Sequence, residues 1–224
     1  MLPLYPLRKL KTTDQQMTDD ILTESYSFYG EEEAGLGLMV AESPYRELSA
    51  LLEDLLSVKG SSFVSLLKEI TSHNEFKPLD GENGIFITGG EKAEDYANLL
   101  SAARKAVGYG YRVFILPNPK NIRTADFIFE RKGVYKMFDL KTIMGKSSAE
   151  NRLLESIGQT NHVLLNMATD YEPRLLAKDV KTYFEANKNA REVLIIKGNK
   201  FLSVSRQFVE GKDYFKMFIK RYLK

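Results

Sequence analysis

The sequence predicts an α/β fold, with a mixed central sheet flanked by helices and a helical segment at the N-terminus. After residue 84, short apolar runs typical of strands alternate with segments of helical periodicity. Before residue 76, apolar residues recur at helical spacing, as in Leu48, Leu51, Leu52 and Leu55. We therefore divide the chain into an acidic helical segment or small accessory domain at 1–75 and a second domain at 76–224.

The elements are bounded by glycines, prolines and capping residues. Strands are expected at 85–88, 111–116, 125–129, 134–141, 162–167, 192–197 and 200–204. Helices are expected at 14–23, 43–58, 63–70, 173–186 and 208–223. Two further helices should begin at capping boxes, one running from 88–91 to about 107 and the other from 147–150 to about 157. Turns at 131–133 and 198–199 predict two β-hairpins.

Composition narrows the possible chemistry. The 224 residues are 43% hydrophobic and contain no cysteine, which excludes disulfides and thiolate metal sites. Two histidines are too few for a histidine-rich zinc site, so a bound metal would be held by carboxylates, which favours magnesium, manganese or calcium. No apolar run reaches membrane-spanning length and no signal peptide is recognisable, so we expect a cytoplasmic protein without a membrane partner.

Charge is distributed unevenly along the chain. Residues 1–75 hold 6 basic and 13 acidic side chains, a net charge of −7. Residues 76–224 hold 26 basic and 17 acidic side chains, a net charge of +9. A basic segment is suited to a polyanion such as nucleic acid, although ordinary surface solubility explains the same numbers equally well.

Three residues of the predicted hairpin carry the chemistry. Asp139 and Lys141 are two positions apart on one strand and so project from the same face, whereas Leu140 faces the other way. Asp126 lies on the paired strand, and an acid on the preceding helix could extend the metal shell, the candidates being Glu91, Glu94 and Asp95. Two carboxylates can hold a divalent ion beside a phosphate, and a neighbouring lysine can stabilise the charge that builds during phosphodiester hydrolysis. The alternative is a simple surface ion pair, since Asp-x-Lys is common by chance.

Residues 84–205 resemble the C-terminal tRNA nuclease domains of contact-dependent growth inhibition toxins, a branch of the PD-(D/E)XK class with a restriction-endonuclease-like fold. The matching segments, in order, are GIFITGG, Glu94–Asn98, GYRVFILP, Thr124–Phe127, Phe138–Lys141 and a run that begins at Gln159. The resemblance implies Glu94, Asp126 and Asp139 as ligands of Mg²⁺ or Mn²⁺, with Lys141 and Gln159 completing the catalytic set. It further implies RNA, specifically tRNA, as the substrate, and an immunity protein as a possible partner.

Other residues are candidates for binding the substrate. Arg123, Lys146 and Arg152 flank the expected site and could contact phosphates, and His162 is more often a core histidine than a phosphate ligand. The lysines and aromatic residues of 208–223 could clamp nucleic acid, or form an ordinary amphipathic helix. Two other functional classes stay open: a non-catalytic module that binds nucleic acid or protein, and a structural protein of a mobile element.

Overall fold

The structure, a computed structural model, describes residues 46–55, 57–89, 95–117, 125–145 and 149–224. The helices in these ranges are α2 (Leu48–Asp54), α3 (Ser61–Thr71), α4 (Tyr96–Gly108), α5 (Ala149–Leu154), α6 (Pro173–Ala186), α7 (Arg206–Glu210) and α8 (Tyr214–Leu223). The strands are β1 (Lys77–Pro78), β2 (Ile85–Ile87), β3 (Arg112–Ile115), β4 (Phe127–Arg131), β5 (Val134–Ile143), β6 (His162–Met167), β7 (Glu192–Lys197) and β8 (Lys200–Ser205).

Within the described ranges, these strands form an eight-stranded sheet in which each strand lies beside its neighbours in sequence. The pairs β2–β3, β5–β6 and β6–β7 are parallel, and the remaining four pairs are antiparallel. The predicted mixed sheet flanked by helices is therefore confirmed. Both predicted hairpins are present as β4–β5 and β7–β8.

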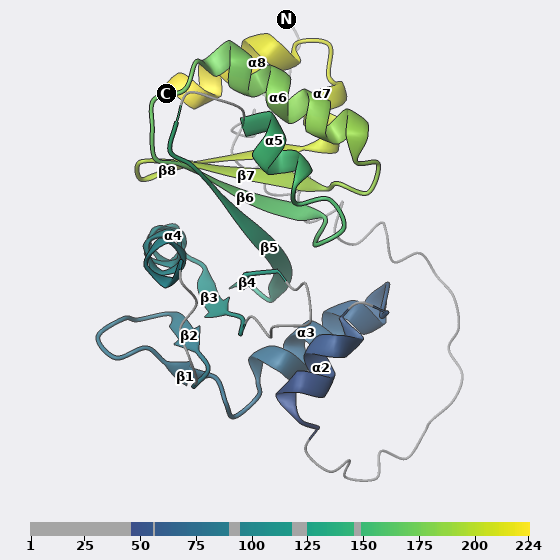
Figure 1. Cartoon of the computed structure of the whole chain (residues 1–224), viewed down its shortest axis with the longest axis vertical. Coiled ribbons are helices and arrows are strands. Elements are labelled where there is room, and N and C mark those ends of the chain that lie inside the picture. The colour runs from purple at the N-terminus through teal and green to yellow at the C-terminus, as the bar shows by residue number, and fades with distance from the viewer. Residues whose placement is uncertain (1–45, 56, 90–94, 118–124, 146–148) are drawn as a thin grey trace, which may run out of the picture.

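Strand β5 joins two halves of the sheet (Figure 1). Its first half, up to Phe138, pairs with β4, and its second half, from Asp139 onward, pairs with β6. The change of partner occurs in the middle of one strand, so the sheet divides at that point into a β1–β5 half and a β5–β8 half.

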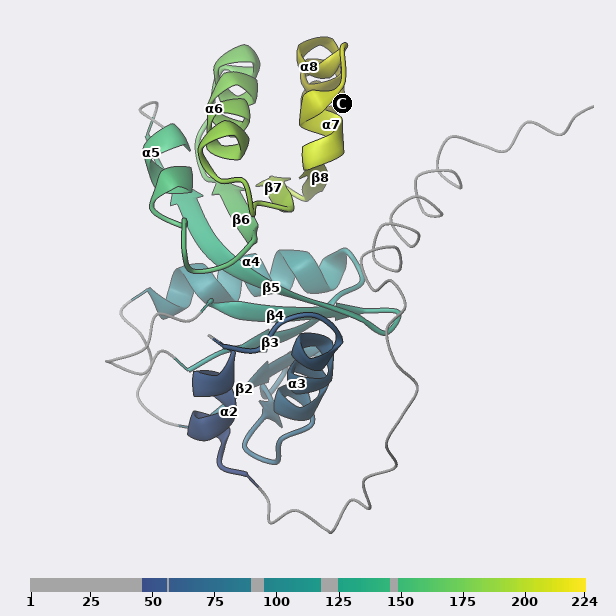
Figure 2. The ribbon, with the colours of Figure 1, turned by 90° about the vertical axis from the view of Figure 1, so that its right-hand side faces the viewer.

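Three groups of helices cover the sheet (Figures 1 and 2). Helix α4 packs on one face, where its alanines meet side chains from both halves, including Phe127, Phe138 and Leu194. The opposite face is shared: α2 and α3 cover Ile128 and Met137, whereas α5 to α8 cover the face of β6 and β7. The side chains of β5 at the boundary thus lie between two helical layers.

Residues before 76 contribute directly to this core. Leu67 and Ile70 of α3 are fully buried in a cluster with Phe114 and Ile128 of the sheet. Burying each such side chain contributes about 2 kcal/mol, so α2 and α3 act as a layer of the folded unit. The described helices include none that is both long and apolar enough to cross a bilayer.

Three details of the helices differ from expectation. Helix α2 covers only Leu48–Asp54 of the expected 43–58. The predicted helix 208–223 is instead two helices, α7 and α8, separated at Gly211, because extended backbone at this glycine (φ −65°, ψ 140°) ends α7. Helix α5 ends at Leu154 rather than near 157. The expected helix 14–23 lies outside the described residues.

Candidate active site

Asp126 and Asp139 face each other across the β4–β5 hairpin. The register pairs Phe127 with Phe138, which places Asp126, one residue before β4, opposite Asp139. The backbone continues this pairing, since the Asp126 amide donates to the Phe138 carbonyl at 3.0 Å. Both carboxylates therefore lie on one face, at the point where β5 changes partner from β4 to β6.

Lys141 lies on the same face as Asp139, as the strand alternation predicts. Its Nζ is 2.7 Å from Asp139 Oδ2, and only 14% of the Lys141 side chain and 3% of the Asp139 side chain are exposed. Leu140 projects to the other face and packs in the cluster around α4. The pair is a largely buried ion pair rather than one on an open surface.

The Asp126 carboxylate is fixed by the backbone of the neighbouring strand. The Leu140 amide donates to Asp126 Oδ2 at 2.6 Å. The Asp126 and Asp139 side chains are close enough to share a hydrogen bond. Asp139 Oδ2 receives no well-aligned hydrogen bond from the described residues, despite its short contact with Lys141. That oxygen is therefore paired with Lys141 by charge rather than through an aligned hydrogen bond.

Burial dominates the electrostatics of the site. Loss of solvation, with a smaller contribution from the charge of Asp139, raises the pKa of Asp126 to about 7 against the opposing effects of the Leu140 amide and Lys141. Burial likewise raises the pKa of Asp139, although Lys141 opposes this change. When both buried carboxyl groups are ionised they carry two negative charges, and the Lys141 ammonium offsets only one of them. A divalent cation would offset the rest.

Further acidic residues surround the pair. The negative charge of Asp95, immediately before α4, acts on Asp126, and that of Glu155, after α5, acts on Asp139. The described residues contain no group of three or more potential ligands already close enough to hold a metal ion. Glu94, expected to be the third ligand, lies outside the described residues, so Asp126 and Asp139 are the two ligands that the structure brings together.

The segment between α5 and β6 lies near these carboxylates. Thr160 Oγ1 donates to the Met137 carbonyl at 3.2 Å, which fixes the segment to β5 two residues before Asp139. In the neighbouring residue, Gln159 Nε2 donates to the Glu155 carbonyl at 3.1 Å. The Gln159 amide thus helps to close the end of α5, and its expected contact with Lys141 or a water stays a prediction.

The expected phosphate contacts fall into different surroundings. Arg152 is 57% exposed and pairs with Glu155 at 3.0 Å, so part of its charge is already compensated. Arg123 and Lys146 lie outside the described residues. His162 lies on the α4 face, edge-on to Phe138, and burial lowers its pKa to about 4, so it is a neutral core residue away from the carboxylates.

Two neighbours of Asp139 were not identified from sequence. Glu155 follows α5, whereas the acids expected to join the site lie on the helix before the hairpin. Tyr183 of α6 is fully buried, its hydroxyl accepts a hydrogen bond from Asn187 at 3.2 Å, and the charge of Asp139 contributes to its raised pKa after the larger effect of burial. A buried tyrosine in an amphipathic helix carries no sequence signal that distinguishes it from ordinary core.

Comparisons with known proteins add one similarity. No protein-family model matches the chain, and no curated protein matches it. Among solved structures, the chain is similar to a CdiA-CT/CdiI toxin and immunity complex from Burkholderia pseudomallei, with 14% identity and a TM-score of 0.37, covering 53% of this chain and 98% of that one. So distant a similarity says nothing about the function of this chain.

Proposed function

We propose that this chain is a metal-dependent nuclease that hydrolyses phosphodiester bonds, with RNA, and tRNA in particular, favoured over DNA. The observation that carries the proposal is the convergence of Asp126, Asp139 and Lys141 on one face of β4 and β5. The preference for tRNA rests only on the resemblance in sequence.

The two carboxylates suit Mg²⁺ or Mn²⁺. Hard divalent cations prefer carboxylate oxygens, and here one oxygen of a buried aspartate has no aligned donor among the described residues. Asp126 and Asp139 would hold the ion, with Glu94 as the proposed third ligand. When bound, such an ion lowers the pKa of a coordinated water and offsets negative charge on the phosphate.

The protein's own groups are arranged for the rest of the reaction. The Leu140 amide orients Asp126, and Asp139 holds the Lys141 ammonium close to the carboxylates. From that position Lys141 can place a compact positive charge beside a phosphate oxygen as the water–phosphorus bond forms and the ester bond breaks. In this proposal Gln159 orients Lys141 or the water, and Arg123, Lys146 and Arg152 contact the backbone of the nucleic acid.

The test is cleavage by the purified full chain. Total tRNA, other RNA and plasmid DNA are incubated separately with magnesium, with manganese or with EDTA. We expect cleavage of tRNA that EDTA abolishes. Asp139→Asn and Lys141→Met should remove it, whereas the matched controls Asp213→Asn and Lys188→Met, at exposed positions, should retain it.

Other results would point to the alternative classes. A parent chain that cleaves no substrate with any divalent ion contradicts the nuclease proposal and favours a non-catalytic binding module or a structural protein of a mobile element. The resemblance also implies an immunity-type protein partner, for which the expected effect is inhibition of cleavage by a stoichiometric complex.

A further inference from the structure

A pocket separate from the carboxylate site lies at the carboxyl ends of β6 and β7. It has a volume of about 440 Å³, and its lining includes Met167, Thr169, Asp170, Lys197, Lys200 and Tyr222. Asp139, by contrast, is paired with the second residue of β6, near the opposite end of that strand.

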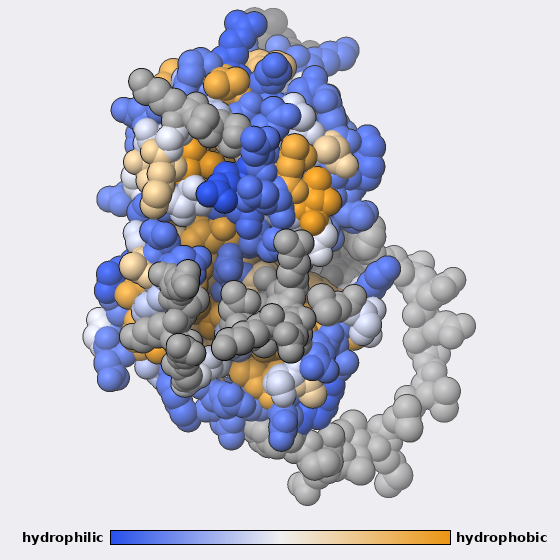
Figure 3. Space-filling view, in the orientation of Figure 1, coloured by the Kyte–Doolittle hydropathy of each residue, from blue (hydrophilic) through white to orange (hydrophobic). Residues whose placement is uncertain are grey.

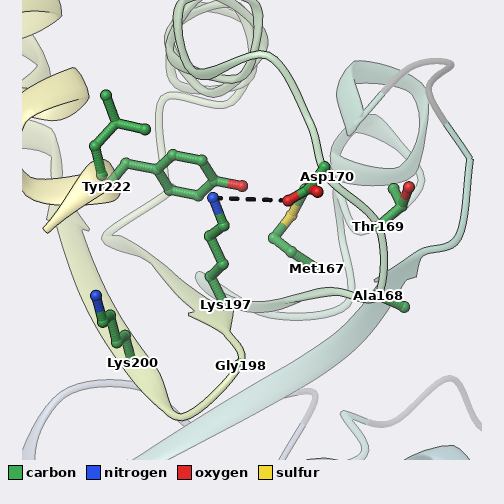
Figure 4. Close-up of a pocket in the computed structure, with 9 residues that line it drawn as sticks. Met167, Ala168, Thr169, Asp170, Lys197, Gly198, Lys200 and Tyr222 are labelled. Atoms are coloured by element: carbon green, nitrogen blue, oxygen red, sulfur yellow. Dashed lines mark ion pairs between the residues drawn. The ribbon is translucent and has the colours of Figure 1, made fainter.

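Cationic and aromatic groups meet in this pocket (Figure 4). Lys197 Nζ lies 4.4 Å from the centre of the Tyr222 ring and 4.0 Å from Asp170. Lys200 lies on the neighbouring wall, where its ammonium donates to the Lys224 carbonyl. With two lysines and one aspartate, the lining carries a net charge of +1.

Tyr222 supplies a second and independent observation. The residue is only 4% exposed, and its hydroxyl has no hydrogen-bond partner within the described part of the chain. Figure 4 shows this hydroxyl pointing toward Lys197 and Asp170. A buried hydroxyl without a partner is costly, so an acceptor oxygen at this position would be stabilising. Burial raises the pKa of Tyr222, with a further contribution from Asp170, so the group stays a neutral donor.

The contact between Lys197 and Asp170 is easily opened. Asp170 is fully exposed, and exposed ion pairs at such distances contribute little to stability. If Asp170 turns away, Lys197 and the Tyr222 hydroxyl become available to the same anion. Asp170 therefore competes with an anionic ligand for Lys197.

We propose that this pocket binds the phosphate group of a small organic phosphate of nucleotide size, with Lys197 as its main charge and the Tyr222 hydroxyl as its neutral donor. The volume is within the range of small-molecule sites, and Met167 and Leu223 offer apolar surface for the organic part. The site goes beyond the proposed nuclease and does not depend on it, because it shares no residue with the carboxylate site.

The experiment measures binding to the full chain by isothermal titration calorimetry in EDTA. The ligands are adenosine 5′-monophosphate, ribose 5-phosphate, inorganic phosphate and adenosine. We expect saturable binding of the organic phosphates but not of adenosine, and comparison of the first two distinguishes a nucleotide from a sugar phosphate.

Substitutions in the pocket should change the affinity for organic phosphates in opposite directions. Lys197→Met should weaken binding about tenfold or more, since it removes a charge-assisted hydrogen bond, and Asp170→Asn should strengthen it severalfold by removing the competitor. Tyr222→Phe should weaken binding while leaving the free protein as stable or more stable, because the lost hydroxyl has no described partner. Lys188→Met, at an exposed position, is the control.

Two results would overturn the proposal. One is the absence of saturable binding by either organic phosphate. The other is binding that Lys197→Met and Tyr222→Phe leave unchanged, which would place the ligand elsewhere. Thermal melting of each variant without ligand establishes that a loss of binding does not reflect unfolding.

Discussion

Strand β5 takes part in two lysine–carboxylate pairs on opposite faces of the sheet, Lys136 with Glu192 of β7 and Lys141 with Asp139 of β5, and the two carboxylates differ in the aligned hydrogen bonds that they accept. On the α4 face, Lys136 donates to Glu192 Oε2 at 2.8 Å and Ser203 donates to Oε1 at 2.5 Å. On the other face, Lys141 approaches Asp139 Oδ2 at 2.7 Å, but that oxygen receives no aligned hydrogen bond from the described residues. The first pair is closed, and the second is open to a further ligand.

The pKa shifts of the two acids follow this difference. Burial alone would raise the pKa of Glu192, yet the charge of Lys136, together with the hydrogen bonds from Lys136 and Ser203, outweighs it and holds that pKa below its usual value. At Asp139 the same burial prevails over Lys141, and the pKa rises. Lysines at similar distances thus leave the two acids with opposite pKa shifts, because the charges and aligned hydrogen bonds at Glu192 outweigh its burial whereas those at Asp139 do not.

The largest expected effect separates the two pairs by activity. Asp139→Asn and Lys141→Met should each reduce cleavage by about 10²- to 10³-fold, the scale for loss of a preorganised electrostatic group. Glu192→Gln should retain cleavage, since that pair lies on the opposite face. Initial rates of tRNA cleavage with magnesium check this prediction. Equal losses in all three variants would contradict the assignment of the active site to the face that carries Asp139 and Lys141.

The next effect separates the pairs by stability. Glu192→Gln removes the counter-charge of Lys136 and should cost about 2 kcal/mol, less than for a fully buried pair because Lys136 is 27% exposed. Asp139→Asn should cost less, about 1 kcal/mol, because Asp126 stays near Lys141 as a counter-charge and because burial already disfavours the carboxylate that is removed. Urea denaturation without metal measures both, and a reversed order would contradict the comparison.

Metal binding should depend on the open pair alone. Magnesium at about one hundred times its Kd should stabilise the parent by about 2.7 kcal/mol through linkage. Asp139→Asn should lose most of this increase in melting temperature, whereas Glu192→Gln should keep it despite a lower starting value. If Asp139→Asn responds as the parent does, the ion lies elsewhere.

The remaining effect is a pH dependence of the metal-free protein. Asp126 has a pKa of about 7 in the folded chain against 3.8 in the unfolded chain. Between these values the folded state holds a proton that the unfolded state has released, so this contribution to stability is lost as pH rises from about 4 to about 7.

Asp126→Asn should remove that contribution. His162, whose pKa burial lowers to about 4, acts in the opposite sense, since protonation favours the unfolded chain as pH falls below about 6.5. It is present in both proteins and cancels in their difference. Urea denaturation of parent and variant from pH 4 to 8 in EDTA measures that difference: the variant should gain stability relative to the parent as pH rises from about 4 to about 7.

Local patterns predicted most of the elements because they depend on neighbours in sequence. At the β4–β5 turn, Lys132 and Gly133 adopt positive φ angles of 52° and 81°, the conformation that a tight hairpin needs, and Arg131-Lys132-Gly133 indicated that turn. The break between α7 and α8 was missed, because the hydrophobic periodicity of 208–223 continues through Gly211. Apolar spacing does not reveal that the backbone changes direction.

The sequence by itself determined the alternating pattern of strands and helices, and it placed Asp139 and Lys141 on one face of a strand, because side-chain direction alternates along β-structure. The tertiary structure decided the rest. The register that sets Asp126 opposite Asp139, and the fold that brings Glu192 to Lys136 across 56 positions, depend on strand pairing between distant segments. Burial was decided there too, since solvent is excluded from β5 only when the helices on both sides of it have packed.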